Sequence, residues 1–384
     1  MLKRIYLDAN AGAPLLAEAR DAVVDALERA ANASSVHAEG RGARGLVESA
    51  RTEVAQAVSA QAENVVFTSG ATEAAALALT PGISSGAPVR RLYVGATEHP
   101  CVLAGGRFPG AAVTRLPVLR SGAIDLAALE AALHGHDQDA GPPFLALMLA
   151  NNESGVIHPI AEAVRLVKVH GGYIFCDAVQ ALGRIPVGIG ALGVDFLALS
   201  AHKIGGPQGA GALVLADGKV CPEPLLAGGG QERRRRSGTE NVAAIAGFGV
   251  AARLARHHLS SIGRIAALRA RLEQELIAVS PEAEIVGMGA ERLPNTTLFA
   301  VPGIPAETAV IAFDLDGIAL SAGSACSSGK VAASHVLEAM GFSADMARAG
   351  LRVSLAASTS DADIDGFIVA WRAIHSRMRR SQAA

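Results

Sequence analysis

The chain has 384 residues, of which 50% are hydrophobic and 18% charged, and its formal net charge is −2. A disordered chain would be poorer in apolar residues and richer in net charge, so this composition indicates a folded protein with a sizeable core. Because 34 basic and 36 acidic residues nearly balance, no overall field would recruit nucleic acid or an anionic membrane, and we expect neither as a partner.

The N-terminal residues carry two early cations but no apolar stretch of signal-peptide length, and polar residues interrupt every later apolar run before it could span a bilayer. Four cysteines stand far apart with no Cys-x-x-Cys pair, so neither a zinc site nor a disulfide framework is indicated. We therefore expect a cytoplasmic protein without a metal.

Short apolar runs alternate with helical patterns through the first two thirds of the chain, which is typical of a parallel sheet built from strand-helix-strand units. The candidate strands are 64–68, 91–95, 144–149, 173–176, 196–199 and 212–215. An amphipathic helix is predicted over 44–59. Ligand sites in such sheets lie at the carboxyl ends of the strands, so the residues that follow each run are the candidates for function.

The pattern of predicted secondary structure changes near Arg253. A long helical pattern over 255–279 is followed by a mixed strand-and-helix region that ends in a helix over 364–380. This change predicts a second, smaller domain.

Asp177 and Lys203 each follow a buried strand and are separated by one crossover unit. Lysine occurs at only five positions, and Lys203 alone is at a strand exit flanked by serine, histidine and glycines. Pyridoxal phosphate needs a lysine amine for its Schiff base and a carboxylate opposite its ring nitrogen. Either residue alone could be a solvated loop charge, but the pair favours a cofactor site.

A phosphate site needs clustered backbone N–H groups at a helix N-terminus. The segment 68–73, Thr-Ser-Gly-Ala-Thr-Glu, lies between a predicted strand and a helical run. It could also be an ordinary helix cap. Its place in the series of strand ends favours the phosphate site.

Seven strings occur in an order and spacing that match a known family. They are SGATE (69–73), EH (98–99), NNE-G (151–155), DAVQ (177–180), SAHK (200–203), GGGQER with RSGT (228–239) and SAGSACSS (321–328). The chain therefore resembles the cysteine desulfurases of the NifS/IscS type, which belong to the class V group of pyridoxal-phosphate enzymes, and the resemblance covers almost its whole length.

The resemblance implies an α/β protein of pyridoxal-phosphate fold type I. Its large domain, 15–255, would hold a mainly parallel seven-stranded sheet flanked by helices. A smaller α/β domain would comprise 1–14 and 256–384 and carry a mobile cysteine loop at about 321–334. The active form is implied to be a homodimer.

The resemblance also implies roles for single residues. Lys203 corresponds to the Schiff-base lysine, Asp177 to the partner of the ring nitrogen, Gln180 to the donor to the ring oxygen, and His99 to the histidine that stacks on the ring and can assist proton transfer. The implied cofactor-binding set is Ala71, Thr72, His99, Asn152, Asp177, Gln180, Ser200, His202, Lys203 and Thr239 of the partner subunit. Arg352 and Asn152 would clamp the substrate carboxylate, because a planar guanidinium can bind both carboxylate oxygens at once.

Cys326 lies among small residues where packing would not demand a thiol. The resemblance makes it the nucleophile that takes sulfur from L-cysteine as a persulfide, releases L-alanine and passes the sulfur to an acceptor, such as an iron-sulfur scaffold protein or the tRNA thiolation machinery. The nucleophile would be the thiolate. Cys176, Cys101 and Cys221 are expected to be inert.

Two alternatives remain open at this stage. The first is another reaction on the same scaffold, such as selenocysteine lyase, cysteine-sulfinate or aminotransferase chemistry, and the second is a non-catalytic scaffold or partner protein. Departures from the family pattern bear on substrate preference and rate: Gly12 and Ala13 replace two threonines, Ala74–Ala76 replace polar residues, and Gly205 and Gln208 replace a tyrosine and a lysine. The arginine run 233–236 could indicate nucleic-acid binding, but no aromatic residues interleave with it.

Overall fold

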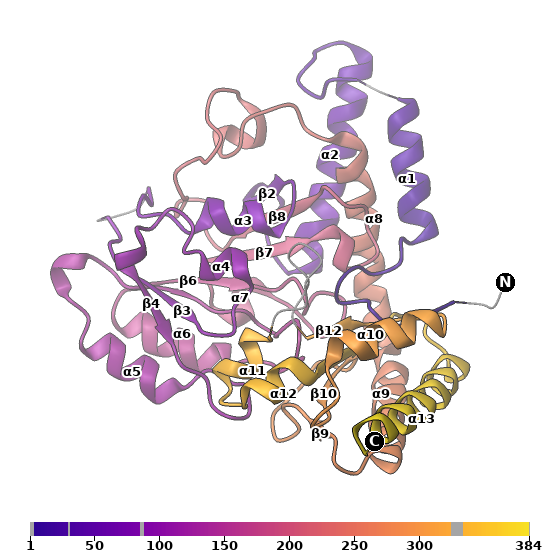
Figure 1. Ribbon diagram of the computed structural model, residues 1–384. Coiled ribbons are helices and arrows are strands. Elements are labelled where there is room, and N and C mark those ends of the chain that lie inside the picture. The colour runs from indigo at the N-terminus through magenta and orange to yellow at the C-terminus, as the bar shows by residue number, and fades with distance from the viewer. Residues whose placement is uncertain (1–3, 30, 85–87, 324–332, 384) are drawn as a thin grey trace.

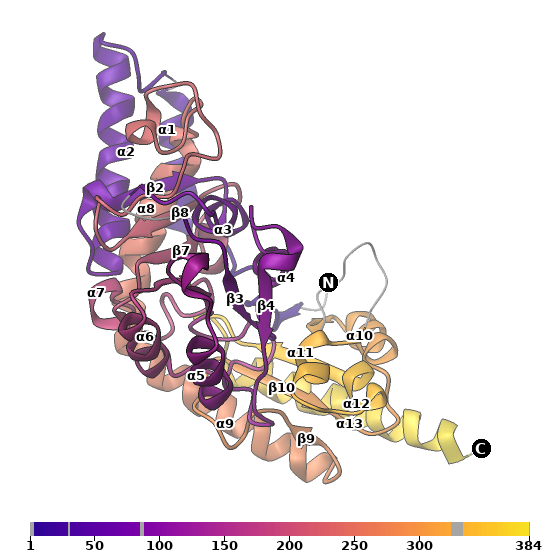
Figure 2. The same ribbon diagram turned by 90° about the vertical axis from the view of Figure 1, so that its left-hand side faces the viewer.

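The computed structural model describes residues 4–29, 31–84, 88–323 and 333–383. Helices α1, α2 and α8 stand at one end of the molecule, and the C-terminal part, coloured orange to yellow, lies at the other (Figures 1 and 2). The large sheet lies between them.

The large sheet has seven strands in the order β2-β8-β7-β6-β5-β3-β4. Their bounds are β2 Val65–Thr68, β3 Leu92–Gly95, β4 Val113–Leu116, β5 Phe144–Ala146, β6 Tyr173–Asp177, β7 Phe196–Ser200 and β8 Gly211–Leu215. Strand β8 runs antiparallel to both of its neighbours, and all other pairs are parallel. The mainly parallel seven-stranded sheet is therefore confirmed, and each of the six predicted strands overlaps one of its members.

Strand β4 was not predicted, and its position explains why. It is the edge strand beyond β3, and three of its four residues are only partly buried or exposed. The sequence Val-Thr-Arg-Leu therefore lacks the continuous apolar character that marks the buried strands.

Helices cover both faces of this sheet. Their bounds are α1 Ala17–Glu28, α2 Ala38–Ala57, α3 Ala71–Ala78, α4 Pro100–Leu103, α5 Leu126–His134, α6 Ile160–Val169, α7 Ile189–Leu192 and α8 Val242–His258. One core joins α2, α5, α6 and α8 to alternate strand residues such as Leu145 and Leu197. The other joins α3 and α4 to the intervening residues, such as Phe144 and Phe196. The period of two along each strand thus gives each layer of helices its own apolar surface.

The C-terminal part has a four-stranded antiparallel sheet in the order β12-β13-β10-β9 and a parallel pair, β1 with β11. The strands are β1 Ile5–Tyr6, β9 Glu284–Ile285, β10 Thr296–Ala300, β11 Ile318–Ala319, β12 Ser321–Ala322 and β13 Gly350–Ser354. The helices are α9 Ile262–Val279, α10 Ala306–Leu315, α11 His335–Ala339, α12 Ala344–Ala349 and α13 Asp361–Ala383. Their shared core is built around Phe299, Phe313, Phe367 and Trp371.

The predicted helix 255–279 is two helices, because α8 ends at His258 and α9 begins at Ile262 after the 3-10 turn Leu259–Ser261. Separate cores lie on the two sides of this turn, and the N-terminal residue Leu7 belongs to the C-terminal core. We propose that these cores correspond to the domains 15–255 and 1–14 with 256–384.

Within the described residues, no helix is both long and apolar enough to cross a membrane. The cytoplasmic location stays a prediction.

Candidate active site

Asp177 and Lys203 follow neighbouring strands of the large sheet. Asp177 is the last residue of β6, and Lys203 ends the 3-10 turn Ala201–Lys203 that follows β7. Burial raises the pKa of the Asp177 carboxyl to about 6, while the hydrogen bond from the Val179 amide and the charge of Lys203 oppose that rise. A carboxylate in this position is ready to pair with a cation.

The Lys203 amine is held by the N-terminal segment. Its Nζ donates to the carbonyl oxygens of Asn10 at 2.7 Å and Ala11 at 2.9 Å. Burial and the nearby charges of Arg352 and Arg184 lower the pKa of the amine to about 8. About a tenth of the amine is therefore unprotonated at pH 7, far more than for a lysine with an ordinary pKa, as a lysine nucleophile requires.

The start of α3 approaches β8 closely. A Cβ atom at Gly211 would lie 2.6 Å from the Cα of Gly70, the N-cap of α3, so only glycine allows this packing. The amides of Ala71 and Thr72 belong to the first turn, where no helical carbonyl can accept their hydrogens. These two predicted phosphate ligands are therefore positioned as donors at a helix N-terminus.

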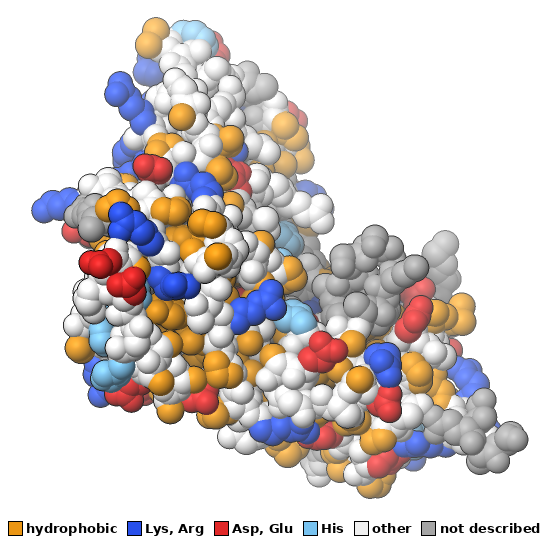
Figure 3. Space-filling model, turned by 60° about the vertical axis from the view of Figure 1, so that its left-hand side comes forward, with side chains coloured by type: hydrophobic (Ala, Val, Ile, Leu, Met, Phe, Trp, Pro, Cys, Tyr) orange, Lys and Arg blue, Asp and Glu red, His pale blue; other side chains and the backbone are white. Residues whose placement is uncertain are grey.

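Arg236 anchors the same turn. Its guanidinium pairs with Glu73 at 2.7 Å, and Glu73 also accepts the Ser69 amide at 2.7 Å. Farther along the loop, Glu232 forms a two-point ion pair with buried Arg51 at 2.7 and 2.8 Å. Part of the arginine-rich segment thus holds its own loop against the large sheet, and on the face drawn in Figure 3 basic side chains are interspersed with acidic ones.

His99 and His202 are both held as neutral rings. Burial and the charges of Lys203 and His335 lower the pKa of His99, although part of this residue is exposed to solvent. Burial and Lys203 lower the pKa of His202 to about 4, and its Nδ1 lies 2.9 Å from the Ser200 hydroxyl. Neutral rings at these two positions leave the positive charge of this region on Lys203, Arg184 and Arg352.

Gln180 is buried between the N-terminal segment and Arg184. Its Nε2 donates to the Asn10 carbonyl at 3.1 Å, and its Oε1 accepts from Arg184 at 2.7 Å. The sequence places Gln180 and Lys203 on different loops, and both contact the same Asn10 oxygen.

Arg352, on β13, is 2% exposed and lies against the site from the C-terminal part. It donates to the Asn152 carbonyl at 3.0 Å and pairs with Asp8 at 2.7 Å. Its Nε has no hydrogen-bond partner among the described residues. The geometry therefore leaves an unsatisfied buried donor on the residue predicted to bind a carboxylate, and Asp8 balances part of its charge.

Two predicted site residues stand apart from this group. Thr239 is exposed and lines a hollow with Thr68 and Ser69, whereas Lys203 does not line that hollow. Cys326 lies outside the described residues.

Sequence reasoning assigned no role to a set of polar residues that lie close to the predicted ones. They are Asp8, Asn10, Glu98, Glu153, Arg184 and His335. Asp8 and Asn10 directly follow the apolar run 5–7, so the strand-end rule used for Asp177 could have found them. Glu98, Glu153 and Arg184 lie within or close to the strings already noted, but nothing in a single sequence shows that these charged groups are buried.

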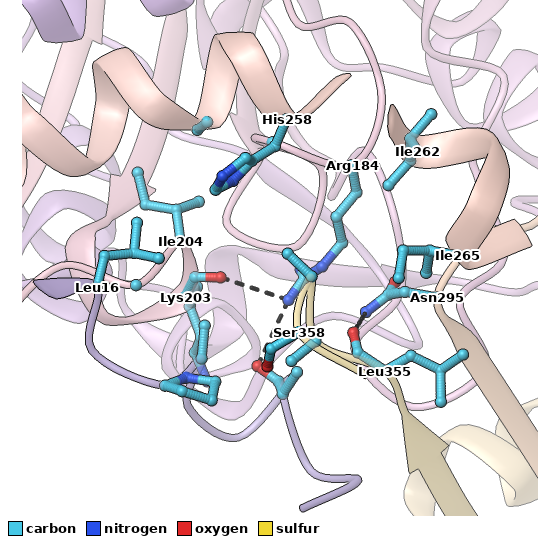
Figure 4. A pocket seen from close by; sticks show the side chains of 18 of the residues that line it. Leu16, Arg184, Lys203, Ile204, His258, Ile262, Ile265, Asn295, Leu355 and Ser358 are labelled. Atoms are coloured by element: carbon cyan, nitrogen blue, oxygen red, sulfur yellow. Dashed lines mark hydrogen bonds between the residues drawn. The ribbon is translucent and has the colours of Figure 1, made fainter. Parts of the chain in front are cut away.

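A cavity of about 270 Å³ lies where the two parts of the chain meet. Lys203 lines this cavity, whereas Asp177 and His99 do not. Figure 4 shows Arg184 and His258 facing it among Leu16, Ile204 and other apolar side chains. Arg184 donates across it to the carbonyl oxygens of Lys203 and Ala9, both at 3.4 Å. Because Lys203 is the one of these three proposed reacting groups that lines it, the cavity adjoins the active site on one side of Lys203.

The donor set fits pyridoxal phosphate. It offers an amine with a lowered pKa, a buried carboxyl at the next strand end, and a helix N-terminus whose close approach to β8 needs Gly211. Within the described part of the chain, no group of three or more His, Cys, Asp or Glu side chains could hold a metal ion.

Comparisons of the sequence and the structure with known proteins point to the same family. Residues 5–367 match the family described as "Aminotransferase class-V". The chain is 38% identical over 370 residues to a cysteine desulfurase of Cereibacter sphaeroides, covering 95% of this chain and 94% of the relative. It is 36% identical over 372 residues to the cysteine desulfurase IscS of Dictyoglomus turgidum, covering 95% and 93%. The crystal structure of a NifS-like protein from Rickettsia africae superposes with a TM-score of 0.88 at 34% identity, covering 97% of this chain and 99% of that one.

Proposed function

The chain belongs to the class-V aminotransferase family and is a pyridoxal-phosphate-dependent cysteine desulfurase, and we propose that Lys203, Asp177, His99 and Cys326 carry its reaction. The observation that supports this assignment best is the Lys203 amine, which is half-buried, has its pKa lowered to about 8, and follows the strand next to that of Asp177. The enzyme acts on L-cysteine and yields L-alanine and transferable sulfur.

The cofactor, when bound, supplies an electron sink that acidifies the α-hydrogen of the substrate. Lys203 would bind its aldehyde carbon, and Asp177 would hold the ring nitrogen in its protonated form. The first turn of α3, with Ser200 and His202, would hold the phosphate. His99 and Gln180 would contact the ring and its oxygen.

Lys203 is the residue that moves the α-proton. Its amine is released when substrate binds, and a pKa near 8 leaves it basic enough to accept a proton and weak enough to return it. The Asn10 and Ala11 carbonyls orient the amine. His99 assists from the other side as a neutral ring that can donate one proton.

Arg352 and Asn152 bind the substrate carboxylate. The Arg352 Nε is an unused donor among the described residues, and the ion pair with Asp8 keeps the guanidinium in place before substrate arrives. A carboxylate that binds here gains charge-assisted hydrogen bonds at a site that is already desolvated.

Cys326 takes the sulfur. Its thiolate attacks the sulfur of the substrate, and the new S–S bond forms as the substrate C–S bond breaks. The electron pair of that bond stays on the substrate carbon, which is protonated to give L-alanine. The persulfide on Cys326 then passes its outer sulfur to a thiol of the acceptor protein.

The protein that accepts the sulfur from Cys326 is a further part of the proposal. We take the acceptor to be an iron-sulfur scaffold protein or a tRNA-thiolation protein.

The enzyme would be a homodimer, because Thr239 is exposed beside the apolar residues Leu225 and Leu226, a surface suited to completing a neighbouring site. Sedimentation equilibrium should give about twice the chain mass of 39.0 kDa; a monomer at micromolar concentration would contradict the dimer.

The decisive experiment follows both products. Holoenzyme incubated with L-cysteine should release alanine, and mass spectrometry of its peptides should find an additional sulfur on Cys326. Cys326→Ser should keep the yellow cofactor and lose sulfur release, whereas Lys203→Ala should be colourless. Cys221→Ala is the matched control and should behave as wild type. Normal desulfuration by Cys326→Ser would overturn the role of this cysteine.

A further inference from the structure

A second cysteine contacts the active-site histidine. The Sγ of Cys101, in the first turn of α4, lies 3.0 Å from Nδ1 of His99. From the sequence this thiol was expected to be inert. The inference below rests on the proposed role of His99 and deepens it.

The backbone fixes the direction of this hydrogen bond. His99 is the N-cap of α4, and its Nδ1 lies 3.3 Å from the Cys101 amide nitrogen. A backbone N–H can only donate, so Nδ1 must be an acceptor that carries no hydrogen. The thiol that approaches the same atom must then donate as well. A neutral ring with an unprotonated Nδ1 carries its single hydrogen on Nε2.

The Cys101 thiol is suited to be a donor and not a nucleophile. Burial and the charge of Asp177 raise its pKa to about 12, so the sulfur keeps its hydrogen throughout the physiological range. The thiolate is the nucleophilic form of cysteine. Although Cys101 lies inside the site, it is therefore poorly suited to carry a persulfide.

The Thr72 side chain lies close enough to the Cys101 sulfur to oppose part of the rise in the pKa of this thiol. Thr72 lies at the start of α3 and His99 at the start of α4, so Cys101 connects the phosphate-binding turn to the ring-contacting histidine.

We propose that Cys101 is a positioning residue whose thiol donates to Nδ1 of His99 and holds the imidazole neutral with its hydrogen on Nε2. To become a cation, the ring would have to give up both donors at Nδ1. Lys203 and His335, the other charged or titratable groups that act on His99, oppose the cation as well. His99 therefore has one proton to offer, and it is on the nitrogen that points away from α4.

The test is nitrogen NMR of the cofactor-free enzyme, so it does not depend on turnover. Imidazole ¹⁵N shifts identify the tautomer, and His99→Gln identifies the signals of this ring. In wild-type enzyme we expect hydrogen on Nε2. Cys101→Ala removes one donor to the neutral ring and should raise the pKa of His99 by about 0.5 to 1. Cys101→Ser supplies a hydroxyl donor and should restore most of the wild-type behaviour.

The matched control is Cys221→Ala. The Cys221 thiol also donates a hydrogen bond, to the Gly218 carbonyl oxygen at 3.0 Å, but it lies on the loop after β8, so the variant should leave the His99 signals unchanged. A wild-type ring with hydrogen on Nδ1, or a His99 pKa unchanged by Cys101→Ala, would overturn the proposal. So would persulfide on the Cys101 peptide after incubation with L-cysteine. Failure of the desulfurase assay alone would count against the proposed function and leave the NMR result standing.

Discussion

Buried carboxyl groups near the active site differ in the charge they carry. Burial and the neighbouring Asp177 hold the pKa of Glu98 well above its usual range, whereas burial raises the pKa of Asp177 to about 6, so Asp177 is the carboxyl that ionises first as pH rises. Two close carboxyls cannot both ionise cheaply in a desolvated site. The first negative charge is therefore that of Asp177, which the charge of Lys203 stabilises.

Asp177→Asn should lower kcat for cysteine desulfuration. The change removes a charge that would hold the cofactor ring nitrogen, a charged hydrogen bond worth about 1.5 to 3 kcal/mol, so the expected loss is roughly 10- to 150-fold. Steady-state assays with the cofactor at saturation check it. Asp217→Asn, at an exposed turn, is the control. Equal kcat values for Asp177→Asn and Asp217→Asn would show that Asp177 takes no part in the reaction.

Glu153 predicts a pH dependence of stability. Its carboxyl is buried, accepts a hydrogen bond from Ser334, and has its pKa raised to about 7. Between pH 4.5 and 7 the native state keeps a proton that the unfolded state loses, so this group lowers stability as pH rises, by up to about 3 kcal/mol. Glu153→Gln should lose this component. Urea unfolding at pH 5.5 and pH 8.5 measures it.

For that comparison Glu338→Gln, on exposed α11 surface, should keep the wild-type pH dependence. If Glu153→Gln and wild type lose the same stability between the two pH values, Glu153 ionises normally and its burial carries no cost.

At the scale of elements, strands and helices with a repeated apolar pattern could be predicted from the sequence. Helix breaks and contacts between residues far apart in the chain could not. The buried strands around Phe175 and Phe196 are continuous apolar runs, and the strand-end rule placed Asp177 and Lys203 correctly on the sheet. The break between α8 and α9 was missed because the helical pattern continues across Leu259. No local pattern could reveal that Asp8 would pair with Arg352, which lies 344 residues away.

Gly211→Ala tests how α3 is positioned. The new methyl group would meet Gly70 and the Leu199 carbonyl at 2.6 to 2.8 Å, and the backbone has to shift because no side chain can rotate away. Overpacking of this kind costs about 1 to 3 kcal/mol, and where it displaces the phosphate-binding turn, cofactor affinity should fall roughly tenfold or more. Fluorescence titration of apoenzyme with pyridoxal phosphate measures the affinity.

Gly190→Ala is the matched control, since nothing lies within 4 Å of a Cβ atom there and the residue is helical. It should bind the cofactor as wild type does. Unchanged affinity in Gly211→Ala would mean that the start of α3 does not depend on its contact with β8.

At the scale of the whole molecule, the N-terminal segment joins the two parts of the chain at the active site. The Asn10 side chain donates to the Asn152 carbonyl at 3.1 Å and to the Thr296 hydroxyl at 3.0 Å, and it accepts from Asn295 at 3.1 Å. Its own carbonyl accepts from Lys203 at 2.7 Å. One buried residue thus connects β10, the loop after β5 and the reacting amine.

Asn10→Ala should weaken this connection more than it weakens either part. It removes three buried hydrogen bonds, one each to the Asn152 carbonyl, the Thr296 hydroxyl and the Asn295 amide, which should cost about 2 to 4 kcal/mol of unfolding free energy. Hydrogen exchange should rise in β10 and in the Asn10 segment, while the interior of the large sheet stays protected. Asn32→Ala, which removes only a local turn bond to Ser34, is the control. If both variants have the same stability and exchange, the two parts are held together by their apolar contacts and not by the Asn10 side chain.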